Sequence, residues 1–130
     1  MKKFAILIPV YNDWESLTKL LNEINSVTKD IQNVEFKCII VNDASTQLMP
    51  KIHVPSNITS IKVINMKKNK GHARCNAFGI RYLAKKNDYD HVIFMDGDGE
   101  DRPQEIKLLV NKSLVDKNLS IVAKRIISSG

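Results

Sequence analysis

Cysteine, glycine and aromatic residues are scarce in this chain of 130 residues, which has two cysteines, five glycines and 6% aromatic residues. The two thiols, Cys38 and Cys75, lack metal-type spacing, which excludes a disulfide scaffold and favours a reducing compartment. No apolar run approaches the ~20 residues of a membrane-spanning helix. The short apolar run near Met1 stops at Pro9 without a small-residue cleavage site, so it indicates a strand and not a signal peptide. The remaining composition is that of one ordinary globular domain.

Positive charge exceeds negative charge by six at neutral pH, and part of the excess is clustered in the sequence. A solvated lysine-rich surface is one explanation, and attraction to phosphates or to an anionic membrane face is the other. Nucleic acid is not an expected partner, because aromatic side chains do not interleave with the cluster as stacking platforms would. The clustered basic residues are Lys67, Lys68, Lys70, His72 and Arg74.

Strand-like and helix-like segments alternate along the chain. Continuous apolar runs predict strands at residues 4–9, 36–41, 61–65 and 91–95, with a further short strand at 121–124. Helical spacing of apolar residues predicts helices after a cap at Asn12 or Asp13, over residues 72–86, and from Pro103 onward. Trp14 falls on the apolar side of the first helix, so a core position is expected. This alternation predicts an α/β fold with a mainly parallel sheet.

An acidic run follows the last long apolar strand: four carboxylates lie within six residues after Met95. Such a cluster at a strand end needs a cation, and Mg²⁺ takes oxygen ligands from one or two carboxylates plus substrate phosphates. Asp96 and Asp98 are the expected metal ligands, although Asp-Gly pairs also form tight turns. Glu100 and Asp101 are expected to serve the turn and the helix that follows.

Polar residues follow three of the predicted strands. In parallel α/β sheets, ligands bind outside the carboxyl ends of the strands, so these residues are expected to line one crevice. The residues are Tyr11, Asn12, Asp13, Asn42, Asp43, Asp96 and Asp98.

Four segments of the chain, taken in order, resemble the motifs of family 2 glycosyltransferases of the GT-A fold. Within that family they are most similar to the subgroup of dolichol-phosphate mannose synthases and bacterial polyprenyl-phosphate sugar transferases. The resemblance covers almost the whole chain and implies a three-layer α/β/α arrangement around a Rossmann-like sheet. The segments are Ile8-Pro9-Val10-Tyr11-Asn12, Val41-Asn42-Asp43-Ala44-Ser45-Thr46, Asn69-Lys70-Gly71-His72-Ala73-Arg74-Cys75-Asn76 and Met95-Asp96-Gly97-Asp98.

The resemblance implies a role for each matching position. Asp43 would accept a hydrogen bond from the base, Asp96 would face the ribose and the metal, and Asp98 would ligate Mg²⁺ or Mn²⁺. The full set of implied nucleotide-binding residues is Pro9, Tyr11, Asn12, Asp13, Asp43, Gly71, Arg74 and Asp96. Physical chemistry agrees for Gly71, which lets backbone approach a ligand, and for Arg74, which favours anionic groups.

Taken together, the expected function is metal-dependent transfer of a sugar from a nucleoside-diphosphate sugar, with UDP as the expected nucleotide, to an acceptor such as a polyprenyl phosphate or a glycan. The acceptor-activating residue finds no match, so residues 1–130 are expected to be a single donor-binding domain cut before the acceptor half. The alternatives are a non-catalytic nucleotide-sugar-binding module and a Mg²⁺-dependent nucleotidyltransferase. A cytoplasmic location is expected, at the cytoplasmic face of a membrane if the longer protein is anchored there.

Overall fold

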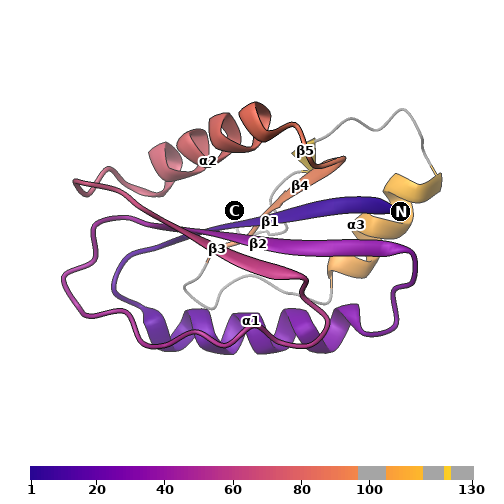
Figure 1. Ribbon diagram of the computed structural model, residues 1–130, viewed down its shortest axis with the longest axis horizontal. Coiled ribbons are helices and arrows are strands. Elements are labelled where there is room, and N and C mark those ends of the chain that lie inside the picture. The colour runs from indigo at the N-terminus through magenta and orange to yellow at the C-terminus, as the bar shows by residue number, and fades with distance from the viewer. Residues whose placement is uncertain (97–104, 116–121, 124–130) are drawn as a thin grey trace.

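The computed structural model describes residues 1–96, 105–115 and 122–123, which form five strands and three helices (Figure 1). Along the chain these are β1 (Lys2–Val10), α1 (Trp14–Thr28), β2 (Val34–Asn42), β3 (Ser60–Asn65), α2 (His72–Lys86), β4 (His91–Phe94), α3 (Glu105–Val115) and β5 (Val122–Ala123). Within this described part, no helix is both long enough and apolar enough to cross a bilayer.

The strands form one sheet in the order β3-β2-β1-β4-β5, and every neighbouring pair is parallel. The β1–β2 pairing runs from Lys2 opposite Val34 to Val10 opposite Asn42. In β1, every residue from Phe4 to Val10 is buried, as expected for a central parallel strand covered on both faces.

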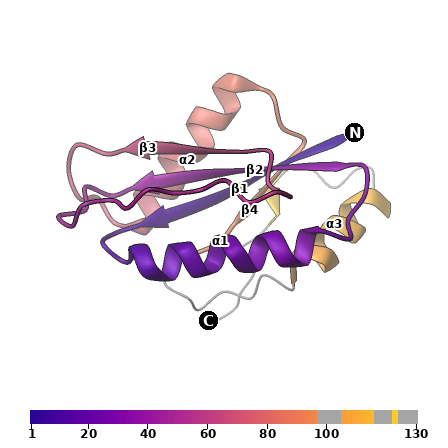
Figure 2. The same ribbon diagram turned by 60° about the horizontal axis from the view of Figure 1, so that its bottom comes forward.

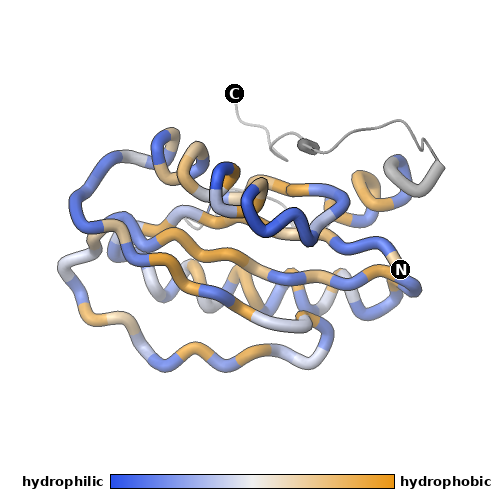
Figure 3. Tube along the Cα trace, turned by 45° about the horizontal axis from the view of Figure 1, so that its top comes forward, coloured by the Kyte–Doolittle hydropathy of each residue, from blue (hydrophilic) through white to orange (hydrophobic). Residues whose placement is uncertain are grey.

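The two faces of the sheet are covered by different helices: α1 and α3 lie on one face and α2 on the other (Figures 1 and 2). Successive side chains of a strand point to opposite faces, so β1 contributes to two cores. Phe4, Ile6 and Ile8 pack in the cluster that includes α1 residues, while Ala5 and Leu7 pack in the cluster that includes α2 residues. Hydrophobic strands therefore form the middle of the molecule (Figure 3). The expected three-layer α/β/α fold with a parallel, Rossmann-like sheet is confirmed.

The predicted elements agree with this structure, with small differences at their ends. The helix predicted over residues 72–86 is found with the same bounds. β1 begins earlier than the apolar run does, because Lys2 still pairs with Val34. β4 ends at Phe94, and the N–H of Met95 continues the pairing by donating to the carbonyl of Leu7 at 3.0 Å. Pro103, the predicted start of the third helix, lies outside the described residues.

Two packing details fix the layers close to the site. A Cβ atom built on Gly79 would lie 2.4 Å from Cδ1 of Leu7, so a larger residue there would force the Leu7 side chain to shift. Trp14 is buried, as predicted, and its indole N–H donates to the carbonyl of Gln47 at 3.1 Å. The connection between β2 and β3 is thereby held against the start of α1.

Candidate functional site

The carboxyl ends of the strands carry the polar segments that the sequence singled out. The chain runs from β1 outward through β2 to β3 on one side, and returns to β4 on the other side of β1. The strand order therefore reverses between β1 and β4, and ligands of open α/β sheets bind at such a switch point. The loops after β1, β2 and β4 bring Asn12, Asp43 and Asp96 to this edge.

Asn12 connects the loop after β1 to the loop after β2. Its backbone is left-handed, with φ of 61°, a conformation that asparagine tolerates better than most residues. Its N–H donates to Oγ of Ser45 at 2.8 Å, and its Oδ1 accepts the N–H groups of Thr46 and Gln47, both at 2.8 Å. The Asn12 side chain also donates from Nδ2 to Oγ1 of Thr46 at 3.0 Å, so its contacts join the two loops and shape the site.

The other residues of this segment differ in exposure. Pro9 is buried within β1, opposite Val41, and lies past the point where β4 stops pairing with β1. Tyr11 is 41% exposed. Asp13 precedes α1, and its carboxylate accepts the N–H of Ser16 at 3.4 Å, so it caps the helix. A polar recess of about 390 Å³ lies at this loop, lined by Tyr11, Asn12, Asp13, Trp14, Glu15 and Gln47.

Asp43 is a buried carboxylate, only 1% exposed, that holds the loop before α2. Its Oδ1 accepts the N–H of Lys70 at 2.7 Å, and its Oδ2 accepts the N–H of Gly71 at 2.9 Å. Its carbonyl also accepts a hydrogen bond from the side chain of Asn69 at 3.2 Å. Both oxygens of this carboxylate thus already accept backbone N–H groups. The expected contact between Asp43 and a base stays a prediction.

Cys75 lies beneath this loop, fully buried in the first turn of α2. Burial, and to a lesser degree the hydrogen bond to Asp43, raise the pKa of its thiol to about 12. The thiol is therefore protonated at neutral pH, which makes it a poor nucleophile. Cys75 is thus a buried thiol that serves the packing of α2.

Gly71 begins α2 with φ of 90°, a value that disfavours every residue with a side chain. A Cβ atom built there would meet no atom within 4 Å, so the surface beside Gly71 is open. No side chain caps the helix. The first N–H groups of a helix lack intrahelical partners, and together with the helix dipole they favour an anion such as a phosphate. Arg74, in the same first turn, is exposed.

Asp96 follows β4 and is 8% exposed. Nδ1 of His72, the first residue of α2, lies 3.9 Å from Oδ1 of Asp96. The structure thus brings the end of β4 next to the start of α2. Asp98, the other expected metal ligand, lies outside the described residues, and those that are described contain no group of three potential metal-ligating side chains.

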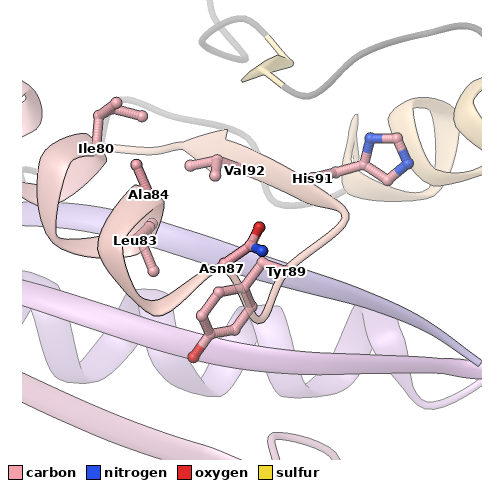
Figure 4. A pocket seen from close by; sticks show the side chains of 7 residues that line it. All are labelled: Ile80, Leu83, Ala84, Asn87, Tyr89, His91 and Val92. Carbon is pink, nitrogen blue, oxygen red and sulfur yellow. The ribbon is translucent and has the colours of Figure 1, made fainter.

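A separate pocket, of about 200 Å³, lies at the opposite edge of the sheet, where α2 ends and β4 begins (Figure 4). Its lining is largely apolar and includes Leu83, Tyr89 and Val92. The His91 ring points away from the side chains of α2 and stacks on Phe4, with ring centroids 4.8 Å apart. Burial lowers the pKa of His91. The pocket holds none of the predicted site residues.

Comparison with known protein families identifies the family of the chain. Residues 5–130 match the family described as glycosyl transferase family 2. The chain belongs to this family. The resemblance seen in the four sequence motifs is therefore confirmed, and so is the GT-A type of sheet that the family implies.

Individual relatives in glycosyl transferase family 2 are longer than this chain. An uncharacterized protein of Methanocaldococcus jannaschii is 27% identical over 119 residues, which cover 89% of this chain and 48% of that protein. The undecaprenyl-phosphate 4-deoxy-4-formamido-L-arabinose transferase of Proteus mirabilis is 32% identical over 111 residues, which cover 85% of this chain and 33% of that protein. The poly(ribitol-phosphate) beta-N-acetylglucosaminyltransferase TarS of Staphylococcus aureus is 32% identical over 72 residues, which cover 55% of this chain and 12% of that protein. The chain spans less than half the length of these relatives.

Sequence reasoning missed which groups hold the loops at this edge of the sheet together. Asn12 was expected to line the nucleotide pocket, and its hydrogen bonds to residues 45–47 were not foreseen. The pairing of His72 with Asp96 and the contact of Cys75 with Asp43 were also missed. One signal was available: Asn12 and Asp43 both follow strands that the sequence places side by side, so contacts between their loops were to be expected.

Proposed function

We propose that the chain forms the donor-binding domain of a glycosyltransferase that takes its sugar from a nucleoside-diphosphate sugar, with UDP as the nucleotide. The observation that carries this proposal is the juxtaposition of the uncapped start of α2 with Asp96 at the switch point of the sheet. Family membership supports the same activity. The names of the Proteus and Staphylococcus relatives contain phosphate-bearing acceptors, so a polyprenyl phosphate or a phosphate-bearing glycan is the acceptor class that we propose.

The start of α2 would bind the diphosphate. The N–H groups of the first turn of α2, from His72 on, supply donors, the open surface beside Gly71 supplies room, and Arg74 supplies a positive charge. Asp43 would hold these donors in position, because it binds the N–H groups of Lys70 and Gly71 just before them. Tyr11, exposed at the end of β1, would offer its ring to the base, with Asn12 and Asp13 shaping the recess around it.

A divalent cation fits the donor set at this edge. A diphosphate at the start of α2 and the carboxylate of Asp96 would repel each other, since both are anions, and Mg²⁺ or Mn²⁺ between them relieves this repulsion. Asp96 and Asp98 would hold the ion. When bound, such an ion acts as a Lewis acid that stabilises the departing diphosphate.

The chain's own residues then have positioning tasks. Asn12 fixes the loop after β2 and Asp43 fixes the loop after β3, so the nucleotide meets a preformed site. Holding the donor in one orientation reduces the entropic cost of the reaction with an acceptor. The residue that activates the acceptor is not assigned to this chain.

Calorimetric titration with UDP tests the proposal. We expect binding to weaken by roughly tenfold or more when EDTA removes divalent cations, because a charge-assisted contact to the diphosphate is lost. Asp98→Ala should remove most of this dependence on metal. Arg74→Ala should weaken binding whether or not metal is present.

Asp88→Ala is the matched control, because Asp88 is an exposed carboxylate at the opposite edge of the sheet, between α2 and β4. It should bind UDP as the unaltered chain does. Metal-independent UDP binding that Asp98→Ala leaves unchanged would contradict the proposal. Saturable UDP-sugar binding by the longer protein without any transfer would instead identify a non-catalytic binding module.

A further inference from the structure

Charge is segregated between the two faces of the molecule. From residue 66 to residue 86, the chain has seven lysines and arginines and no aspartate or glutamate. These residues form the loop between β3 and α2 together with α2 itself, which we call the basic face. On the opposite side of the sheet, α1 carries Glu15 and Glu23 as well as Lys19. The cations of the basic face are Lys67, Lys68, Lys70, Arg74, Arg81, Lys85 and Lys86.

These cations are available to a partner. All seven are exposed. Across residues 1–96, 105–115 and 122–123, the ion pairs involve other lysines, such as Lys37 with Glu35 and Lys107 with Asp30. Lys86 lies over the ring of Tyr82, with Nζ at 5.5 Å from the ring centroid. The basic face therefore has an excess of positive charge, which the nearby carboxylates of Asp43 and Asp96, at the start of α2, offset only in part.

An exposed aromatic ring lies in the middle of this charge. Phe78 is 36% exposed. It shares one side of α2 with Arg74, Arg81 and Lys85, since residues three and four apart lie on the same side of a helix. At the start of the helix, a recess of about 450 Å³ is lined by Asn65, Met66, Lys67, Lys68, Lys70 and Phe78. Lysine side chains around an apolar floor suit a phosphate group carried by an amphiphile.

We propose that the basic face docks on an anionic membrane surface. Clustered lysines and arginines attract anionic headgroups, and the exposed ring of Phe78 between them can enter the headgroup region. In the part of the chain that the structure describes, α2 is the only helix on its face of the sheet, so its outer side is accessible (Figure 1). Single-stranded RNA fits less well, because Phe78 is the only aromatic side chain that this face exposes, and stacking platforms are lacking. The basic face shares Arg74 with the proposed donor site, whereas Arg81 and Lys85 lie further along α2 and outside that site, so a test on these two residues separates docking from nucleotide binding.

Vesicle co-sedimentation tests the docking surface. The chain should bind vesicles made of equal parts phosphatidylcholine and phosphatidylglycerol at low salt and be released at high salt, and it should bind phosphatidylcholine alone weakly. Replacing Arg81 and Lys85 by glutamine removes two cations and should weaken binding roughly 25-fold, at about 1 kcal/mol for each cation. Both side chains are exposed and glutamine favours helices, so circular dichroism should show an unchanged fold.

The matched control replaces Lys29 and Lys51 by glutamine. Both are exposed, and they lie at the end of α1 and in the loop after β2, so the net charge changes equally. This variant should bind vesicles within about twofold of the unaltered chain, because its cations lie away from the basic face. An equal loss in both variants would reduce the effect to net charge and overturn the proposal. Equal binding to neutral vesicles would overturn it too, as would tighter binding to single-stranded RNA than to the anionic vesicles.

Discussion

Replacing Asp43 by asparagine separates two roles for this carboxylate: holding a loop and contacting a base. In the structure, its two oxygens accept the N–H groups of Lys70 and Gly71 at 2.7 and 2.9 Å. An asparagine side chain of the same shape keeps one oxygen and turns an NH₂ group toward the other N–H. One hydrogen bond is then lost, and two donors face each other in a buried place.

The expected cost follows from these contacts. Losing a buried hydrogen bond to a charged group costs about 1.5–3 kcal/mol, and this figure includes the donor that is left without a partner. The remaining bond weakens because its acceptor is no longer charged. We therefore expect Asp43→Asn to lower the free energy of unfolding by about 2–3 kcal/mol. The loop before α2 should loosen as well, so binding should weaken similarly for UDP and for CDP.

Urea denaturation followed by circular dichroism measures the first effect, and calorimetry measures the second. Glu35→Gln, on the strand that precedes Asp43, is the control, since Glu35 makes one ion pair at 3.9 Å with Lys37 and its loss should cost less than about 1 kcal/mol. Unchanged stability of Asp43→Asn would refute the reasoning. Loss of UDP binding alone, with CDP binding retained, would show that Asp43 contacts the base.

Three further outcomes follow from the same structure. Gly71→Ala should cost about 1–2 kcal/mol in the free energy of unfolding, because φ is 90° there, even though the added methyl group meets no atom; urea titration measures this. Burial raises the pKa of both Cys38 and Cys75 to about 12, so Ellman's reagent should react with neither thiol in the folded chain and with both in urea; rapid reaction in buffer would contradict this. Burial lowers the pKa of His91 below its ordinary value of 6.5. The unfolded state therefore binds a proton first, and stability should fall as pH drops from about 6.5 toward the lowered pKa. This decline should be smaller in His91→Phe; an identical pH profile in that variant would assign the decline to other groups.

The fold could be predicted from the sequence because its signals are local. Continuous apolar runs identify the buried strands, and helical spacing identifies α1 and α2. The helix from His72 to Lys86 is bounded by Gly71, with its positive φ, and by Asn87, which ends it in a left-handed conformation with φ of 51°. Glycine and asparagine at the ends of a helix are boundary signals that can be recognised in a sequence. The edge where polar loops gather also follows from the topology of parallel sheets.

The partners of individual polar groups could not be predicted, because they are set by loop conformations. Asp43 and the N–H of Gly71 are 28 residues apart, and no local pattern pairs them. A carboxylate accepts a hydrogen bond from a backbone N–H as readily as from a base, so residue type leaves both partners open. The same holds for Asn12, whose partners lie more than 30 residues further along the chain.

The measurement that tests the central claim most directly is nuclear magnetic resonance mapping of UDP on the chain with Mg²⁺ present. The account predicts that the largest amide shift changes fall at the carboxyl edge of the sheet, at Tyr11, Asn12, Gly71, His72 and Asp96. Amides at the opposite edge, near Tyr89 and His91, should stay unchanged. Shift changes concentrated at that opposite edge, or none at saturating UDP, would contradict a donor site at the switch point between β1 and β4.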